Sequence, residues 1–126
     1  MNRQKEFREI RGKTIREAKL LSCGYAITFT DIGGDSYTLY DPSRSGRFLF
    51  VNGKLEDLIK RKIAQAYERT ENKDEVYYVF ESGDGEGIYV IIRLLAMDQL
   101  NCKWVVKYNK KVPAIEEPKK FRFIDI

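Results

Sequence analysis

From Thr14 onward, short runs rich in Val, Ile, Thr and aromatic residues alternate with turn residues. The best example is the pair "YAITFT" and "SYTLYD", which flank "DIGGD". Period-two runs around a glycine-containing loop predict a β-hairpin, and Gly33 and Gly34 would supply the positive φ angles of its turn. The pattern therefore predicts a mostly antiparallel β fold.

Further strands are predicted on both sides of this hairpin. "TIREAKLL" precedes it, and "FLFV" (48–51) follows as a short strand expected to be buried. The last third predicts a three-strand meander broken by "GDGEG" and "DQLN", and "FRFIDI" ends the chain as a late edge strand or a docked tail. The three meander strands are "EVYYVFES", "IYVIIRLLAM" and "CKWVVKY".

Helical signals are fewer. Residues 3–11 predict a short helix that ends at Gly12. Residues 54–70 fit one amphipathic helix, or a short helix followed by a strand, and spacing alone leaves both open. The expected fold is α+β: a single domain over 1–126, mostly antiparallel sheet with one or two helices, in which 1–12 is an N-terminal extension and 109–126 a basic tail or edge strand.

The composition argues against most catalytic chemistry. The chain has no histidine, which removes Ser-His-Asp, Cys-His and His-based zinc sites. Cys23 and Cys102 form no CxxC pair. The N-terminus has no apolar signal segment and no run is long enough to span a membrane. We expect a cytoplasmic, non-enzymatic protein with no catalytic residue, metal or cofactor, and with reduced thiols.

Charge is unevenly placed along the chain. Residues 1–19 and 103–126 each carry seven lysines and arginines against three acids, while residues 20–102 are net acidic. Basic ends either keep the protein soluble or attract an anionic partner such as nucleic acid, a nucleotide or an acidic protein surface.

Arg93 is the main candidate for function because it interrupts an apolar run. If 88–97 is a strand, Arg93 shares one face with Tyr89, Ile91 and Leu95. A face this apolar should be covered, and a covered guanidinium needs a partner. Either an internal carboxylate pairs with Arg93, or Arg93 binds an exogenous phosphate or carboxylate, with Tyr89 available to stack a base.

Two further sites are weaker candidates. The loop "SRSGR" (43–47) contains Arg44 and Arg47 with a glycine that would let backbone N–H groups converge on an anion. Trp104 lies among lysines in "CKWVVKYNKK", which suits either core packing or a stacking platform for single-stranded nucleic acid.

The order of these segments resembles a family of small phage proteins. "GKTIREAKL", "AITFTDIGGDSYTLYD", "VNGKLEDLIKRKIAQAYE" and "VIIRLL…LN" follow one another as corresponding segments do in the anti-Thoeris sponge proteins. The resemblance covers about residues 12–108. The family's Cys-Cys-Glu segment is replaced here by "SRSGRFLF", and its closing hairpin is reduced to "LNCKWV".

The resemblance implies an oligomeric protein that sequesters a cyclic ADP-ribose-like or cyclic oligonucleotide signal without catalysis, blocking an anti-phage defence in the host cytoplasm. Arg93 and Asn101 are the residues that carry over to the family's ligand-contacting hairpin. The resemblance also favours a short helix and then a strand over 54–70. The alternative is a protein that binds nucleic acid, or inhibits a nucleic-acid or defence complex, through its basic termini.

Overall fold

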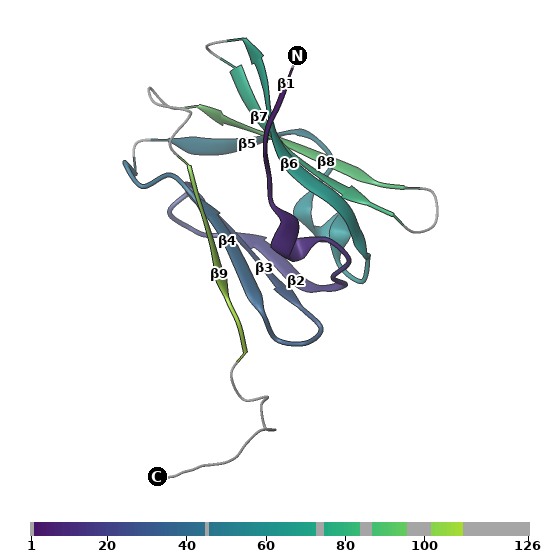
Figure 1. Ribbon diagram of the computed structural model, residues 1–126. Helices are drawn as coiled ribbons and strands as arrows, with labels where there is room; N and C mark the ends of the chain where they lie inside the picture. Colours follow the sequence, from purple (N-terminus) through teal and green to yellow (C-terminus); the bar gives the residue numbers. More distant parts are fainter. Residues whose placement is uncertain (1, 45, 73–74, 84–86, 96–101, 110–126) are drawn as a thin grey trace.

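Two antiparallel sheets pack against each other in the computed structural model (Figure 1). The structure describes residues 2–44, 46–72, 75–83, 87–95 and 102–109. The larger sheet has five strands, in the order β1 (Asn2–Glu6), β6 (Ile63–Asn72), β7 (Glu75–Ser82), β8 (Tyr89–Leu95) and β5 (Arg47–Asn52). The smaller has four, in the order β2 (Ile15–Leu20), β3 (Ala26–Asp31), β4 (Ser36–Tyr40) and β9 (Lys103–Lys107).

The core lies between the two sheets. Alternate residues of each strand point inward, as the period-two pattern requires. Aromatic rings dominate this layer, and Phe29 of the smaller sheet contacts Phe80 of the larger one at 4.8 Å between ring centroids. The largest fully buried side chains are Tyr37, Tyr78, Phe7, Phe29, Phe80, Ile10, Ile15, Ile27, Leu39, Leu58, Ile63 and Ile92.

The antiparallel β part of the expected fold is confirmed, and the α part is wrong for the described residues. Their only helical segments are two short 3₁₀ turns, η1 (Arg8–Ile10) and η2 (Leu55–Leu58). For residues 54–70, the prediction of a short helix followed by a strand is confirmed. The turn η2 ends at Leu58, Lys60 adopts a φ of +71°, and β6 begins at Ile63. A continuous helix cannot pass through a left-handed residue, and residues 63–70 belong to a strand.

The N-terminal residues also differ from expectation. In place of a helix over 3–11, β1 pairs antiparallel with β6 and is followed by the single turn η1. The expected extension over 1–12 contains Phe7 and Ile10, which are completely buried. This segment therefore supplies a strand, Asn2–Glu6, and two core residues, Phe7 and Ile10.

The strands of the last third do not form one meander. β7 and β8 pair as expected, but β9 joins the other sheet, where Leu39 lies opposite Trp104. The segment "FRFIDI" (121–126) lies outside the described residues. Within the last third, sequence order predicted the β7–β8 pair correctly and failed for β9, where the chain crosses between sheets.

The β3–β4 hairpin is confirmed, with a different turn chemistry. Gly34 has a φ of +97°, whereas Gly33 is not in the left-handed region. The carboxylate of Asp31 organises the turn: Oδ1 accepts the N–H groups of Gly33 (2.8 Å) and Asp35 (3.0 Å), and Oδ2 accepts the hydroxyl of Tyr37 (2.6 Å). β5 was expected to be buried, but only Phe48 of this edge strand is.

Candidate functional site

Arg93 lies on the outer face of the five-stranded sheet, the face directed away from the four-stranded sheet. Its neighbours along β8 alternate: Val90, Ile92 and Leu94 are fully buried in the core, while Tyr89 and Leu95 are 55% and 42% exposed. No described element covers this side of β8. The expected sharing of one face by Arg93 and Tyr89 is therefore correct, but the expected cover is not supplied by the described part of this chain.

The register of the sheet places Arg93 in a transverse row. Tyr77 of β7 lies directly opposite it on one side, and Leu49 of β5 on the other. Arg69 of β6 lies opposite Tyr77. Directly opposed residues of antiparallel strands project from the same face, so the outer face carries the row Arg69, Tyr77, Arg93, Leu49.

The two arginines of this row have different environments. Arg69 is engaged, because its Nε lies 2.6 Å from Glu71 Oε2 and its guanidinium lies over the Tyr77 ring at 5.4 Å. Arg93 is held loosely: its Nη2 is 3.8 Å from Glu75 Oε2, and its Nε is buried without a hydrogen-bond partner among the described residues. The Nε of Arg69 is likewise buried without a hydrogen bond to a described residue, so the feature that distinguishes Arg93 is its longer ion pair.

Arg47 extends the positive charge of the outer face. It is exposed and lies opposite Leu95, one diagonal step from Arg93, a separation of roughly 7–8 Å between backbones. Glu81 accepts a hydrogen bond from the Tyr67 hydroxyl at 3.0 Å. The face therefore mixes arginine and tyrosine side chains with carboxylates, and its formal charges nearly balance.

The loop "SRSGR" does not present free backbone donors as expected. The buried Asp41 accepts the N–H groups of Ser43 (3.1 Å) and Gly46 (2.7 Å) and the Ser43 hydroxyl (2.8 Å). The N–H groups do converge on an anion, but that anion is the chain's own carboxylate. Arg44, at a φ of +61°, is exposed at the tip of this loop.

Trp104 is a packing residue, in agreement with the prediction of core packing. Its indole stacks on Phe7 at 4.5 Å and lies 6.0 Å from Tyr37, and its N–H donates to Glu9 Oε1 at 2.8 Å. It belongs to β9 of the other sheet and is not brought together with Arg93. Asn101, the other residue implied by the resemblance, lies outside the described residues.

Buried polar groups inside the core do not form a reactive centre. Burial raises the pKa of the Cys102 thiol to about 11, and a hydrogen bond with Tyr78 offsets this in part. The thiol is therefore protonated at neutral pH, and its nucleophilic form is scarce. Burial also raises the pKa of Glu68, and the charge of Lys5 opposes that shift. Within the described residues, no group of three or more Asp, Glu or Cys side chains could hold a metal ion.

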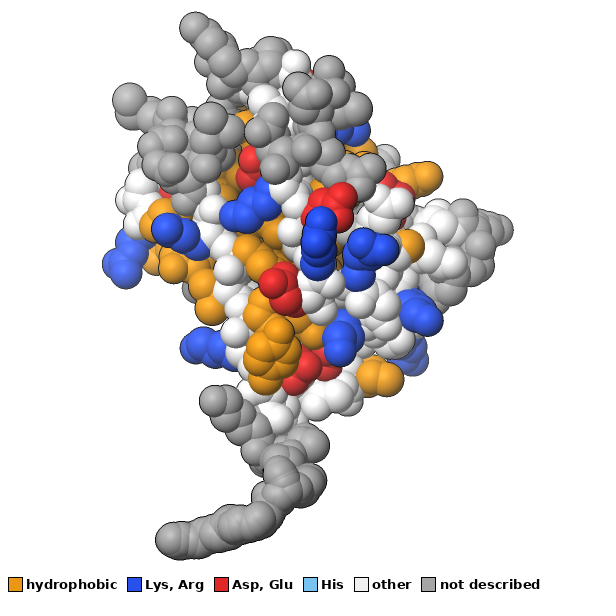
Figure 2. Space-filling model, in the orientation of Figure 1, with side chains coloured by type: hydrophobic (Ala, Val, Ile, Leu, Met, Phe, Trp, Pro, Cys, Tyr) orange, Lys and Arg blue, Asp and Glu red, His pale blue; other side chains and the backbone are white. Residues whose placement is uncertain are grey.

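Basic residues are dispersed on the visible surface. On the face seen in Figure 2, lysine and arginine side chains lie among hydrophobic and acidic ones and do not gather into one patch. Near the N-terminus, Arg8 and Arg11 both lie within 4 Å of Glu6, at 3.5 and 3.9 Å. No helix in the described part of the chain is long and apolar enough to cross a membrane.

Arg69 and Tyr77 were missed by sequence reasoning. Their positions depend on β6 being a strand and on its register with β7. The sequence left open whether this segment is a helix or a strand, and its pattern does not predict the register. Comparison with known proteins adds no assignment: the chain matches no protein-family model, no curated protein and no solved structure.

Proposed function

We propose that this protein is a non-enzymatic binding protein that takes an anionic nucleotide on the outer face of its five-stranded sheet, with Arg93 as the anchor. The observation that carries the proposal is the loosely paired Arg93 guanidinium, whose Nη2 lies 3.8 Å from Glu75 Oε2 in a side chain that is 34% exposed. A guanidinium binds phosphate through two parallel N–H donors, which a single distant carboxylate does not satisfy.

The cost of releasing Glu75 from Arg93 is small. The two side chains are 34% and 36% exposed and their charged atoms are 3.8 Å apart. Exposed pairs of this kind contribute roughly 0–1 kcal/mol. A phosphate that makes a bidentate contact with Arg93 therefore gains more than the protein loses.

The position of Tyr89 bears on the size of the ligand. Tyr89 and Arg93 lie four residues apart on the same face of β8, which is about 13 Å along a strand. A ligand with its ring on Tyr89 and a phosphate on Arg93 is longer than one nucleoside monophosphate. This separation favours a pyrophosphate-containing or two-nucleotide ligand, such as a cyclic ADP-ribose or a cyclic dinucleotide.

Sequestration of such a signal is the biological role we assign to this binding. It agrees with the resemblance to the anti-Thoeris sponge proteins, and a chain without histidine suits a binder better than an enzyme. On this proposal a phage-encoded protein would remove the nucleotide that activates a host defence.

The test is a thermal-shift and calorimetric screen against cyclic ADP-ribose isomers, cyclic di- and trinucleotides, ADP-ribose and short DNA. A ligand at 100 times its Kd adds about 2.7 kcal/mol of stability, which raises the Tm of a domain this size by roughly 3–6 °C. We expect a shift with one nucleotide class that Arg93→Ala abolishes.

Arg16→Ala is the matched control, because it removes the same charge from an exposed position on the other sheet. If Arg93→Ala and Arg16→Ala lose the same amount of ligand-induced stabilisation, the effect is due to net charge and not to the position of Arg93. Shifts with DNA alone that fade steeply with salt would favour the basic termini instead, through counterion release.

A further inference from the structure

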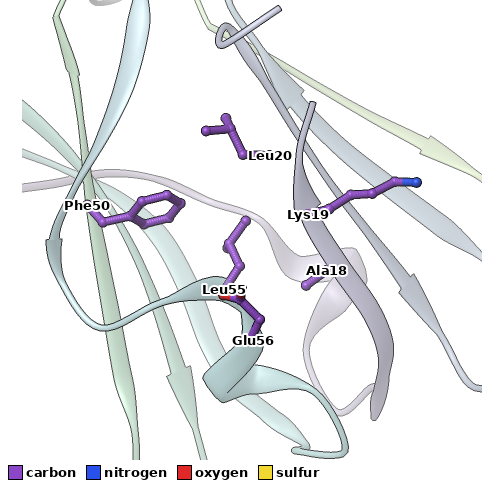
Figure 3. A pocket seen from close by; sticks show the side chains of 6 residues that line it. All are labelled: Ala18, Lys19, Leu20, Phe50, Leu55 and Glu56. Carbon is purple, nitrogen blue, oxygen red and sulfur yellow. The ribbon is translucent and has the colours of Figure 1, made fainter. Parts of the chain in front are cut away.

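The two sheets leave a groove between two of their edges. β2 is an edge strand of the smaller sheet and β5 an edge strand of the larger one. The groove between them has a volume of about 280 Å³. Figure 3 shows the side chains that line it; they come from β2, β5 and the turn η2: Ala18, Lys19, Leu20, Phe50, Leu55 and Glu56.

The groove is apolar inside and has Glu56 at its rim, whereas the Lys19 side chain points away from it (Figure 3). Leu20 and the Phe50 ring point toward each other across it, with Leu55 between them (Figure 3). Leu20 and Phe50 are still 37% and 39% exposed, and the adjacent Val51 is 57% exposed. Exposed apolar side chains on an open strand edge invite pairing with another segment.

We propose that the last six residues of this chain, 121–126, occupy the groove. Their sequence, "FRFIDI", is apolar at four of six positions. Its arginine matches the rim in charge, because Arg122 can face Glu56. A short segment of this composition satisfies both the apolar interior and the acidic residue at the rim.

The chain is long enough for this placement. Asn109 is anchored beside the β3–β4 turn, where its N–H donates to Asp35 Oδ1 at 2.8 Å and its side-chain amide to the Gly33 carbonyl at 3.2 Å. Residues 110–120 span up to about 36 Å when extended. β9 and β2 are the two edges of a four-stranded sheet, which is only about 14 Å wide.

Thermal unfolding of the full-length protein tests the contact. Replacing both tail aromatics, Phe121→Ser with Phe123→Ser, should lower the Tm by several degrees. The matched control is Lys119→Ser with Lys120→Ser, which alters the same number of neighbouring residues and should change the Tm little. Leu20→Ser should lower the Tm as well, and less in the tail variant than in the parent, because contacting residues are not additive. Full additivity, or an unchanged Tm in the tail variant, overturns the inference.

Spin labels test proximity directly. The exposed Cys23 follows β2 in the turn whose Gly24 carbonyl accepts the Phe48 N–H of β5 at 3.0 Å, so it lies beside the groove. A second label on Ile126→Cys should give one narrow distance distribution that is independent of protein concentration. Cys102 is buried and stays unlabelled.

Two outcomes of the spin-label experiment would overturn the inference. A narrow distribution that appears only at concentrations where dimers form would assign the groove to a second copy. A broad distance distribution at all concentrations would show that residues 121–126 do not occupy the groove, which would then be open to a different protein. Neither outcome bears on the proposed function, because none of the groove residues belongs to the outer face that carries Arg93.

Discussion

The ring of Trp104 lies 4.5 Å from the ring of Phe7, centroid to centroid, at an interplanar angle of 21°. Phe7 precedes every strand of the smaller sheet, and Trp104 belongs to β9, the last described strand. Phe7 also lies 6.2 Å from Phe80 and 6.4 Å from Tyr78 of the larger sheet. This single ring therefore joins the beginning and the end of the described chain to the core of both sheets.

Phe7→Ala should destabilise the protein by about 3–5 kcal/mol, the usual cost of removing a fully buried aromatic ring. The free energy of unfolding can be measured in urea from the fluorescence of Trp104, the only tryptophan in the chain. Tyr108→Ala is the control, since Tyr108 is 59% exposed and its loss should cost clearly less. Equal costs would mean that Phe7 contributes no more than an exposed aromatic residue, as expected if residues 1–12 were an N-terminal extension.

The sequence predicted local structure well and long-range pairing poorly. The β3–β4 hairpin follows from "DIGGD" between two period-two runs, because turn chemistry and alternation act over a few residues. The partner of β9 does not, because pairing with β4 depends on where the Trp104 ring packs in three dimensions. The N-terminal segment was misread for the same reason: two apolar residues among charges gave too little pattern to indicate a strand and a core.

The candidate site was predicted in part. Alternation along β8 placed Arg93 and Tyr89 on one face, and the structure agrees. The neighbours Arg69 and Tyr77 come from other strands, and their positions depend on register, which is set by packing over the whole sheet. For "SRSGR" the composition pointed to an anion, but the preceding Asp41 already supplies one.

Asp41→Ala should destabilise the protein by roughly 2–3 kcal/mol. The substitution leaves the N–H groups of Ser43 and Gly46 without their carboxylate partner, and hydrogen bonds to a charged group contribute about 1.5–3 kcal/mol. Differential scanning calorimetry gives the loss. Ser43→Ala, which removes only the hydroxyl donor to this carboxylate, should cost less.

Phosphate addition tests whether the loop binds anions. In the parent protein, phosphate should give no stabilisation that depends on Arg44, because Asp41 holds the donors of the loop. A phosphate-dependent rise in Tm that disappears in Arg44→Ala would contradict this assignment.

Glu68→Gln should change how stability depends on pH. Burial raises the pKa of Glu68 in the folded state above its ordinary value of 4.5. As the pH rises above that value, the unfolded chain releases this proton first, so the contribution of Glu68 to folding becomes steadily less favourable until the folded-state pKa is passed. The difference in free energy of unfolding between the glutamine variant and the parent should therefore grow in favour of the variant across this window and then level off.

Urea unfolding from about pH 4 to pH 8 measures this difference. Glu17→Gln, at an exposed position of β2, is the matched control. A constant difference for Glu68→Gln would mean that Glu68 titrates alike in the folded and unfolded states.

Glu75→Gln should tighten the binding of an anionic ligand to the outer face. Glu75 Oε2 lies 3.8 Å from Arg93 Nη2, so this carboxylate competes with the ligand for the guanidinium. Its pair with Arg93 is worth at most about 1 kcal/mol because both side chains are partly exposed, and the dissociation constant should fall by up to about fivefold. Isothermal titration with the nucleotide found in the screen measures the change. Glu81→Gln removes the same charge from β7 at a position opposite Tyr89 and should have a smaller effect. If Glu75→Gln weakens binding, then Glu75 positions Arg93 for the ligand and does not compete with it.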